Sequence, residues 1–164
     1  MLNGEEIDTE EEANPLIEVE NHISDDYVSE ESIKIEIHQL INKIEDEKTL
    51  EEVRNELIDR FGIVTDEMEI YMYEEWFEKL ASSLNINRVR QTETLLEIEL
   101  SEDVSNNIQG DKLFLIAYNI NPRFKFNYRM RRIYITLPLI NLESHFIYYV
   151  VSLLNEIINM VKKM

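Results

Sequence analysis

Along the first half of the chain, apolar residues recur every three or four positions, which is the spacing of one face of an α-helix. Residues that favour the first or last turn of a helix interrupt this pattern. Gly62 in particular supplies the positive φ that a helix C-terminus commonly needs. The pattern predicts three helices, over residues 29–44, 49–62 and 66–84. The side chains expected to cap them are Ser29, then Thr49 with Glu52 as a capping box, and Thr65.

Elsewhere apolar and polar residues alternate, which indicates half-buried strands. Residues 16–23 alternate in this way directly after Pro15. The later alternating segments come in two pairs, each separated by a few turn-forming or polar residues, and each pair predicts a hairpin. These pairs are residues 86–90 with 95–100, and residues 123–128 with 132–137.

The remaining segments favour helices. Residues 102–119 are ambiguous, since Leu113 and Phe114 fit a helical face as well as a strand, and we favour a helix broken at Gly110-Asp111. A final helix is expected from about Leu142. Helices followed by two hairpins and a closing helix predict an α+β fold, in which several helices pack on a small, mainly antiparallel sheet of two hairpins.

The length of 164 residues suits a single domain with one core. Residues 1–14 contain six acids, no base and little that is large and apolar, so we expect a disordered acidic linker or terminal tail there. The folded domain is expected over residues 15–164.

The formal net charge is −18, and it is unevenly distributed. Residues 1–111 hold 32 acidic and 8 basic side chains, whereas residues 112–164 hold 2 and 8. This overall charge repels the phosphates of nucleic acid. The chain has no Cys, no apolar run of membrane-spanning length and no signal-peptide pattern, so we expect a cytoplasmic protein with no membrane partner.

Motifs for catalysis are missing from the sequence. With three glycines, neither a phosphate-binding P-loop nor a dinucleotide-binding G-x-G-x-x-G can be written. The three histidines form no H-E-x-x-H pair, and adjacent carboxylates on a helix point about 100° apart, which suits solvated faces better than a catalytic pair. We expect no catalytic, cofactor-binding or metal-ligating residue in this chain.

A basic stretch follows Pro122, and its bases alternate with aromatic rings. In a strand, the rings of Phe124, Phe126 and Tyr128 share one face, so we favour rings in the core and bases in solvent. A platform for single-stranded nucleic acid stays open as the alternative. The candidate basic surface consists of Arg123, Lys125, Arg131 and Arg132.

A second candidate surface lies near the end of the second predicted helix. Glu56 and Asp59 are three residues apart, so they share one exposed face and can present two carboxylates to a basic partner. The alternative is a solvated face on which Glu56 pairs locally with Arg60, and spacing alone favours this alternative.

Three segments in the first half also carry a resemblance to a known family. Residues 25–28 (DDYV), residues 34–37 (KIEI) and residues 56–62 (ELIDRFG), in this order and spacing, resemble the C-terminal domain of bacterial transcription-repair coupling factors. The likeness covers about residues 15–86. This chain has Thr65 where the family often has Pro, and Asn85 where it has Gly, and Asn is the best substitute where φ must be positive.

The resemblance implies that the chain is part of a larger motor. Such factors use ATP hydrolysis to translocate on duplex DNA, release stalled RNA polymerase and recruit the damage-recognition subunit of nucleotide excision repair. ATP and Mg²⁺ would then belong to other domains. The C-terminal domain is implied to be a regulatory, autoinhibitory clamp that packs on the N-terminal repair module, with Glu56 and Asp59 facing arginines of that module.

Two other functions remain open beside this one. A freestanding acidic interaction module or DNA mimic is the first, and acids spread over all faces would favour it, whereas a concentrated patch near Glu56 favours the clamp. A hydrolase that uses carboxylates is the second, and no motif supports it.

Overall fold

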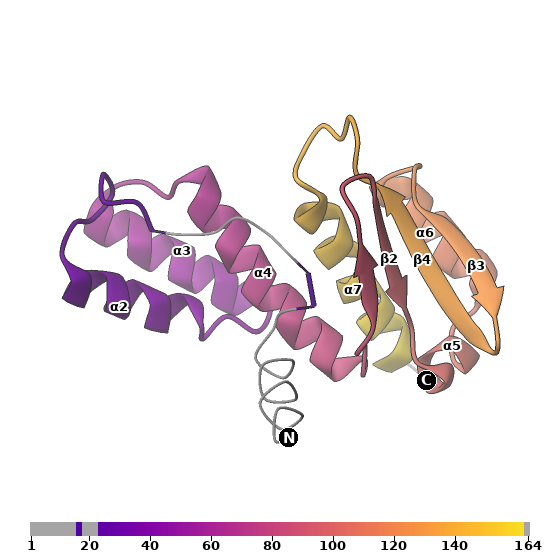
Figure 1. Ribbon diagram of the computed structural model, residues 1–164. Coiled ribbons are helices and arrows are strands. Elements are labelled where there is room, and N and C mark those ends of the chain that lie inside the picture. Colours follow the sequence, from indigo (N-terminus) through magenta and orange to yellow (C-terminus); the bar gives the residue numbers. More distant parts are fainter. Residues whose placement is uncertain (1–15, 18–22, 163–164) are drawn as a thin grey trace, which may run out of the picture.

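The computed structural model describes residues 16–17 and 23–162, in which six helices pack on a four-stranded antiparallel sheet (Figure 1). The predicted α+β class is therefore confirmed. The elements are α2 (Glu31–Ile41), α3 (Glu47–Phe61), α4 (Asp66–Ser83), β1 (Val89–Gln91), β2 (Leu95–Glu99), α5 (Glu102–Asn106), α6 (Gly110–Ile120), β3 (Lys125–Arg129), β4 (Arg132–Pro138) and α7 (Phe146–Lys162).

The molecule has two lobes that share one hydrophobic core (Figure 1). The helical lobe, residues 23–86, places α2 and α3 at one end, and the sheet lobe, residues 87–162, places β3 at the other. Helix α4 packs along α7 where the lobes meet. Phe77 of α4 and Leu154 of α7 are fully buried. Burial of such side chains, each worth about 1.5–3 kcal/mol, holds the lobes together.

The N-cap of helix α3 lies three residues earlier than the capping box predicted from Thr49 and Glu52. Asp46 is the N-cap, and its carboxylate accepts the N–H of Thr49 at 2.8 Å. The hydroxyl of Thr49 in turn accepts the N–H of Asp46 at 3.0 Å, so Thr49 is the last residue of the box, at position N3, and not its first. Both residue types are good caps, and capping at Asp46 adds residues 47–49, most of one turn, to the helix.

Among the other residues predicted to cap or end helices α2, α3 and α4, three are confirmed and one is not. Thr65 caps α4, Gly62 ends α3 with a φ of 91°, and Asn85 follows α4 with a φ of 58°. The prediction that Ser29 caps α2 was wrong, because Glu30 is the N-cap and makes no side-chain capping bond. The first turn of α2 is therefore less firmly fixed than those of α3 and α4.

The sheet has the order β1-β2-β4-β3, so the two predicted hairpins are joined through β2 and β4. Ile98 lies opposite Ile135, and Leu96 lies opposite Leu137. Their side chains are buried on the face that α6 and α7 cover (Figure 1). The alternate residues form an open, polar face.

Two further predicted boundaries differ from the structure. The break between α5 and α6 covers residues 107–109 and ends before Gly110, which is the first residue of α6. Helix α7 begins at Phe146 and not near Leu142, and the ring Nδ1 of His145, directly before it, accepts the N–H of Ile147 at 3.1 Å as a capping side chain does. The strand predicted at residues 16–23 lies largely outside the described residues, as does the acidic segment 1–14.

Two kinds of feature are absent from the described part of the chain. No helix in it is both long and apolar enough to span a membrane. No group of three or more His, Asp or Glu side chains in it is arranged to hold a metal ion.

Candidate functional site

The orientation of α3 is fixed by the residues that it buries. Leu50, Val53 and Leu57 face the core, which turns the opposite side of the helix to solvent. Arg54 also joins α3 to α4, because its guanidinium donates two hydrogen bonds to the carboxylate of Glu69, at 2.9 and 2.6 Å. Such bidentate pairs hold a defined geometry, so α3 presents its outer side as a rigid surface.

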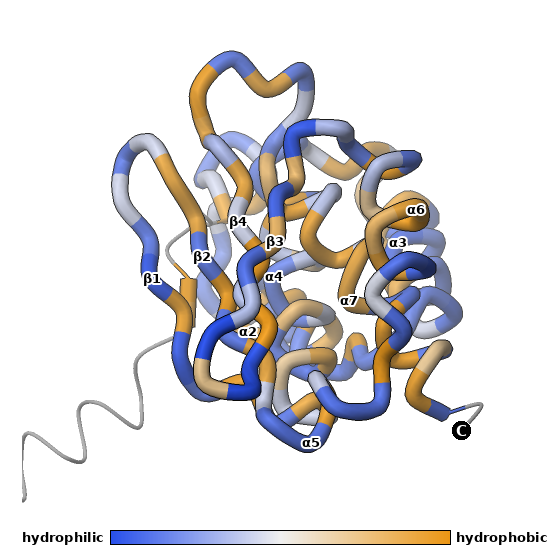
Figure 2. The backbone as a smooth tube through the Cα atoms, turned by 90° about the vertical axis from the view of Figure 1, so that its right-hand side faces the viewer, coloured by the Kyte–Doolittle hydropathy of each residue, from blue (hydrophilic) through white to orange (hydrophobic). Residues whose placement is uncertain are grey.

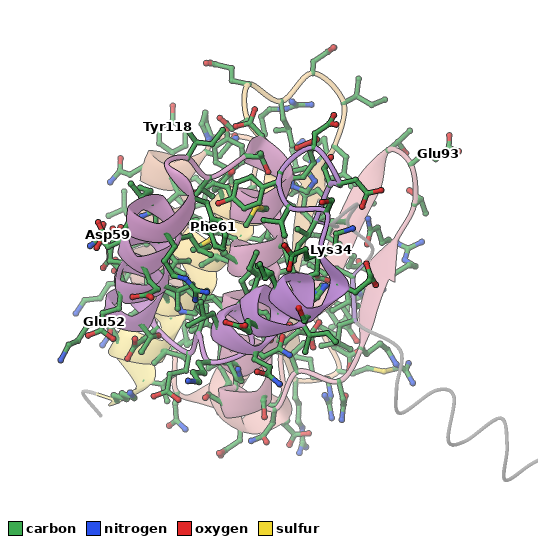
Figure 3. The ribbon with its side chains drawn as sticks, turned by 90° about the vertical axis from the view of Figure 1, so that its left-hand side faces the viewer. Lys34, Glu52, Asp59, Phe61, Glu93 and Tyr118 are labelled. Carbon is green, nitrogen blue, oxygen red and sulfur yellow. The ribbon has the colours of Figure 1, made fainter. Side chains whose placement is uncertain are left out.

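The outer side of α3 carries a row of carboxylates at helical spacing, Glu52, Glu56 and Asp59, which we call the α3 acidic face. All three residues are exposed. Figure 3 shows Glu52 and Asp59 on the same side of the molecule, pointing away from its body. Within the described residues, neither of these two carboxylates has a hydrogen-bond or ion-pair partner.

Glu56 makes the local contact that spacing alone favoured, but only at the limit of an ion pair. Its carboxylate lies 4.0 Å from Nη1 of Arg60, and its side chain is 50% exposed. The Nη2 atom of Arg60 lies closer to Glu36 of α2, at 3.0 Å, and the guanidinium lies over the Phe61 ring. Since Arg60 is engaged by α2, most of the Glu56 carboxylate stays accessible.

The segments that carried the family resemblance come together in space. The ring of Tyr27 packs on Phe61 with centroids 5.4 Å apart, and its hydroxyl donates to the carbonyl of Ile63 at 2.5 Å. Asp25 forms an ion pair with Lys34 of α2. These contacts tie the segment before α2 to the end of α3.

Within the heptapeptide 56–62, most residues therefore have a structural task. Leu57 is in the core, Arg60 bridges to α2, Phe61 packs on Tyr27, and Gly62 ends the helix. Ile58 is 42% exposed and so contributes little to the core. Glu56 and Asp59 are the acidic members of the heptapeptide, and both point outward.

The predicted basic surface is partly neutralised in the structure. Arg132 pairs with Glu99 at 3.0 Å, and Arg131 pairs with Glu102 at 3.8 Å. Arg123 and Lys125, the other two members of the predicted set, have no acidic partner among the described residues. The four residues do not form one uniformly basic patch.

The neutralising carboxylates come from β2, which carries Glu99, and from α5, which carries Glu102. They were not among the residues predicted from the sequence to form a site. Glu97 lies between Arg90 of β1 and Arg129 of β3, at 3.3 Å from each, on the open face of the sheet. Glu97 and Glu99 alternate with Leu96 and Ile98 along the strand. That alternation was the available signal, because it places both carboxylates on the polar face.

The expected burial of the three rings around β3 is correct for one of them. Phe124 is buried and Phe126 is half-buried, but Tyr128 is 61% exposed, so the prediction for Tyr128 was wrong. The reason is the position of β3 at the edge of the sheet, where the helices cover the strand incompletely.

The architecture is that of a known domain class. A solved structure, described as the crystal structure of the C-terminal domain of a transcription-repair coupling factor, matches this fold with a TM-score of 0.75 at 16% sequence identity. The match covers 92% of this chain and 94% of that one. The fold is therefore shared over nearly its whole length.

The sequence comparisons give the family. A family model described as the TRCF domain matches residues 17–110, and the chain belongs to this family of transcription-repair coupling factor domains. It is 26% identical over 135 residues to the transcription-repair-coupling factor of Staphylococcus haemolyticus, which covers 80% of this chain and 12% of that protein. It is also 32% identical over 104 residues to the transcription-repair-coupling factor of Staphylococcus epidermidis, a match that covers 61% of this chain and 9% of that protein. The chain thus spans about a tenth of the length of these relatives.

Proposed function

We propose that this domain is a non-catalytic, autoinhibitory clamp within a transcription-repair coupling factor. In this proposal the α3 acidic face binds basic side chains of the N-terminal repair module of the same protein. The parent protein hydrolyses ATP with Mg²⁺ in other domains, translocates on DNA, releases stalled RNA polymerase in the cytoplasm and recruits the damage-recognition subunit of excision repair. The clamp restrains these activities until polymerase is engaged.

One observation carries the proposal. Glu56 and Asp59 lie within the heptapeptide that most specifically marks the family resemblance, yet the fold needs neither carboxylate. Their neighbours Leu57, Arg60 and Phe61 hold the helix in place. A rigid helix that carries accessible carboxylates is well suited to bind guanidinium groups, which contact carboxylates through two parallel hydrogen bonds.

The interaction energies of exposed ion pairs are suited to a clamp that must both close and open. An exposed carboxylate–arginine pair contributes about 0–1 kcal/mol, and a bidentate or partly desolvated pair contributes more. Two or three such pairs would be weak between separate molecules. Within one chain the effective concentration reaches about the millimolar range, so the same pairs can keep a clamp closed. A competing partner can still release it.

The distribution of charge favours the clamp over the acidic-mimic alternative. Residues 23–86 hold 18 acidic and 6 basic side chains, whereas residues 87–162 hold 8 acidic and 9 basic ones. The acidic character is therefore concentrated in the helical lobe. A mimic of the DNA backbone needs negative charge along an extended surface, and the sheet lobe does not supply it.

Calorimetric titration with the isolated N-terminal repair module tests the proposal. The test variant is Glu56→Gln/Asp59→Asn, which removes two charges and preserves shape. Glu93→Gln/Glu143→Gln is the matched control, because it removes two exposed charges from the sheet lobe. Figure 3 shows Glu93 on the side of the molecule away from Asp59.

The expected result is binding that weakens as salt rises and that the test variant loses, while the control variant binds as the wild type does. Equal binding by wild type and test variant would refute the role of Glu56 and Asp59. Binding of the domain to the basic surface of a DNA-binding protein, and not to the module, would support the mimic.

A further inference from the structure

The outer edge of β3 offers unpaired backbone groups. Because β3 is the last strand in the order β1-β2-β4-β3, only one of its sides is paired within the part of the chain that the structure describes. The β3–β4 hairpin closes with a two-residue turn, Met130 and Arg131, both with positive φ. In such a hairpin the residues flanking the turn bond each other, so every second residue of β3 from Arg129 backwards bonds β4. The N–H and C=O groups of Phe126 and Tyr128 therefore point outward.

An apolar groove lies beside this edge. It has a volume of about 400 Å³ and runs between β3 and the start of α6. Phe114 on α6 is 54% exposed and Tyr128 on β3 is 61% exposed. Figure 2 shows α6 as mostly hydrophobic. The residues that line the groove are Gly110, Leu113, Phe114, Phe126, Asn127, Tyr128 and Ile133.

The other face of the same edge is cationic. Lys125 and Arg129 alternate with Phe126 and Tyr128, so their side chains lie on the open face of the sheet. Lys125 is exposed and has no acidic partner within the described residues. Edge lysines also oppose pairing with strands that carry no complementary charge, so this edge selects its partner.

We propose that the β3 edge binds an extended peptide segment in which acidic residues alternate with bulky apolar residues. The segment adds as a fifth strand, and its backbone bonds the outward groups of Phe126 and Tyr128. Its apolar side chains enter the groove beside Phe114. Its acidic side chains lie on the open face, beside Lys125.

A peptide fits this edge better than a single-stranded nucleic acid does. The outward backbone groups include both N–H donors and C=O acceptors, and another strand complements both, whereas a phosphodiester backbone offers acceptors alone. Most of the nearby cations are also occupied, since Arg129, Arg131 and Arg132 each pair with a carboxylate. Few remain to neutralise phosphates.

This surface is separate from the α3 acidic face. Helix α3 and strand β3 lie at opposite ends of the molecule (Figure 1). One surface is negative and the other is apolar and positive, so they select partners of opposite charge. A test of the β3 edge can fail without bearing on the proposed clamp, and the reverse is also true.

Titration of the 164-residue chain with a labelled peptide tests the inference. The probe is acetyl-Asp-Val-Glu-Phe-Glu-Ile-Asp-amide, followed by fluorescence anisotropy and by amide NMR shifts. A peptide of the same composition with its three apolar residues in a row is the control probe. A twelve-residue oligothymidine reports on the nucleic-acid alternative.

Two pairs of variants separate the contributions of backbone and charge. Tyr128→Pro removes an outward N–H, which an edge strand tolerates, while Tyr128→Thr removes the ring and keeps the N–H. Lys125→Glu reverses a charge at the edge, and Lys43→Glu makes the same change on an exposed residue of the helical lobe. Circular dichroism checks that each variant is folded.

The inference predicts saturable binding of the alternating peptide, with amide shifts concentrated in β3 and α6. Lys125→Glu should weaken binding about fivefold and Lys43→Glu should leave it unchanged. Tyr128→Pro should weaken it more than Tyr128→Thr does. No binding up to about 1 mM peptide at low salt, equal binding of the control peptide, or preferential binding of oligothymidine would each overturn the inference.

Discussion

The turn between β3 and β4 stores backbone strain that substitution can relieve. Met130 and Arg131 have φ values of 51° and 66°, although neither is the Asn or Gly that a two-residue hairpin turn favours. Met130 is 88% exposed, so its side chain contributes little packing. Replacing the pair by Asn and Gly, as Met130→Asn/Arg131→Gly, is therefore expected to stabilise the protein.

The magnitude follows from three opposing contributions. A non-glycine residue in the left-handed region costs about 1–2 kcal/mol, and Asn and Gly remove part or all of this cost. Glycine loses more conformational entropy on folding than other residues, which lowers the expected gain in stability by about 0.5–1 kcal/mol. Loss of the Arg131–Glu102 pair, which is long and exposed, costs about 0–1 kcal/mol. The net expected gain is about 1 kcal/mol.

Urea denaturation followed by circular dichroism measures this gain. With a slope of about 2 kcal/mol per molar urea, the midpoint should rise by about 0.5 M at an unchanged slope. Glu102→Gln is the control, because it removes the partner of Arg131 and leaves the turn residues in place. A midpoint that stays constant or falls in the Asn-Gly variant would refute the reasoning about the strained turn.

Two further predictions concern pH and helix capping. Asp46→Ala should cost about 1 kcal/mol of unfolding free energy at pH 7. The hydrogen bond from the N–H of Thr49 holds the pKa of Asp46 below its usual 3.8. The stability lost in Asp46→Ala should therefore become smaller as pH falls through that lowered pKa. An equal loss of unfolding free energy in urea titrations at pH 7 and about pH 2.5 would contradict this prediction. Burial lowers the pKa of His145, whose Nδ1 accepts the N–H of Ile147 at 3.1 Å. Below about pH 6.5 the unfolded chain therefore binds more protons at this residue than the folded chain does. The free energy of unfolding should decrease as pH falls through that value. His145→Asn keeps an acceptor and should remove that decrease; parallel stability curves for wild type and variant between pH 5 and 7.5 would contradict this assignment.

Elements with a strong local pattern could be predicted from the sequence, and their exact ends could not. Helix α4 follows from its apolar spacing and from Thr65, and both agree with the structure. The start of α7 was missed because Leu139, Ile140 and Leu142 continue an apolar pattern, whereas His145, whose ring accepts the N–H of Ile147, is not a usual capping residue. Competition between two good caps, Asp46 and Thr49, is equally hard to resolve locally.

For the candidate surfaces, too, features set by local sequence could be predicted, and features set by the packing of distant segments could not. Exposure of Glu56 and Asp59 follows from the helical face that Leu57 buries, so local periodicity was sufficient. The pairing of the basic residues was not predictable in this way, because it depends on β2 lying next to β4. Strand order is set by packing between distant parts of the chain. The exposure of Tyr128 depends on that order too.

Site-directed cross-linking is the most direct test of the central claim, that the α3 acidic face contacts the N-terminal repair module. The chain contains no Cys, so Asp59→Cys introduces a single thiol that can carry a photoreactive group. Glu93→Cys provides the control on the sheet lobe. The account predicts a cross-link to the repair module from position 59 and none from position 93. Equal cross-linking from both positions, or cross-linking from position 93 alone, would contradict it.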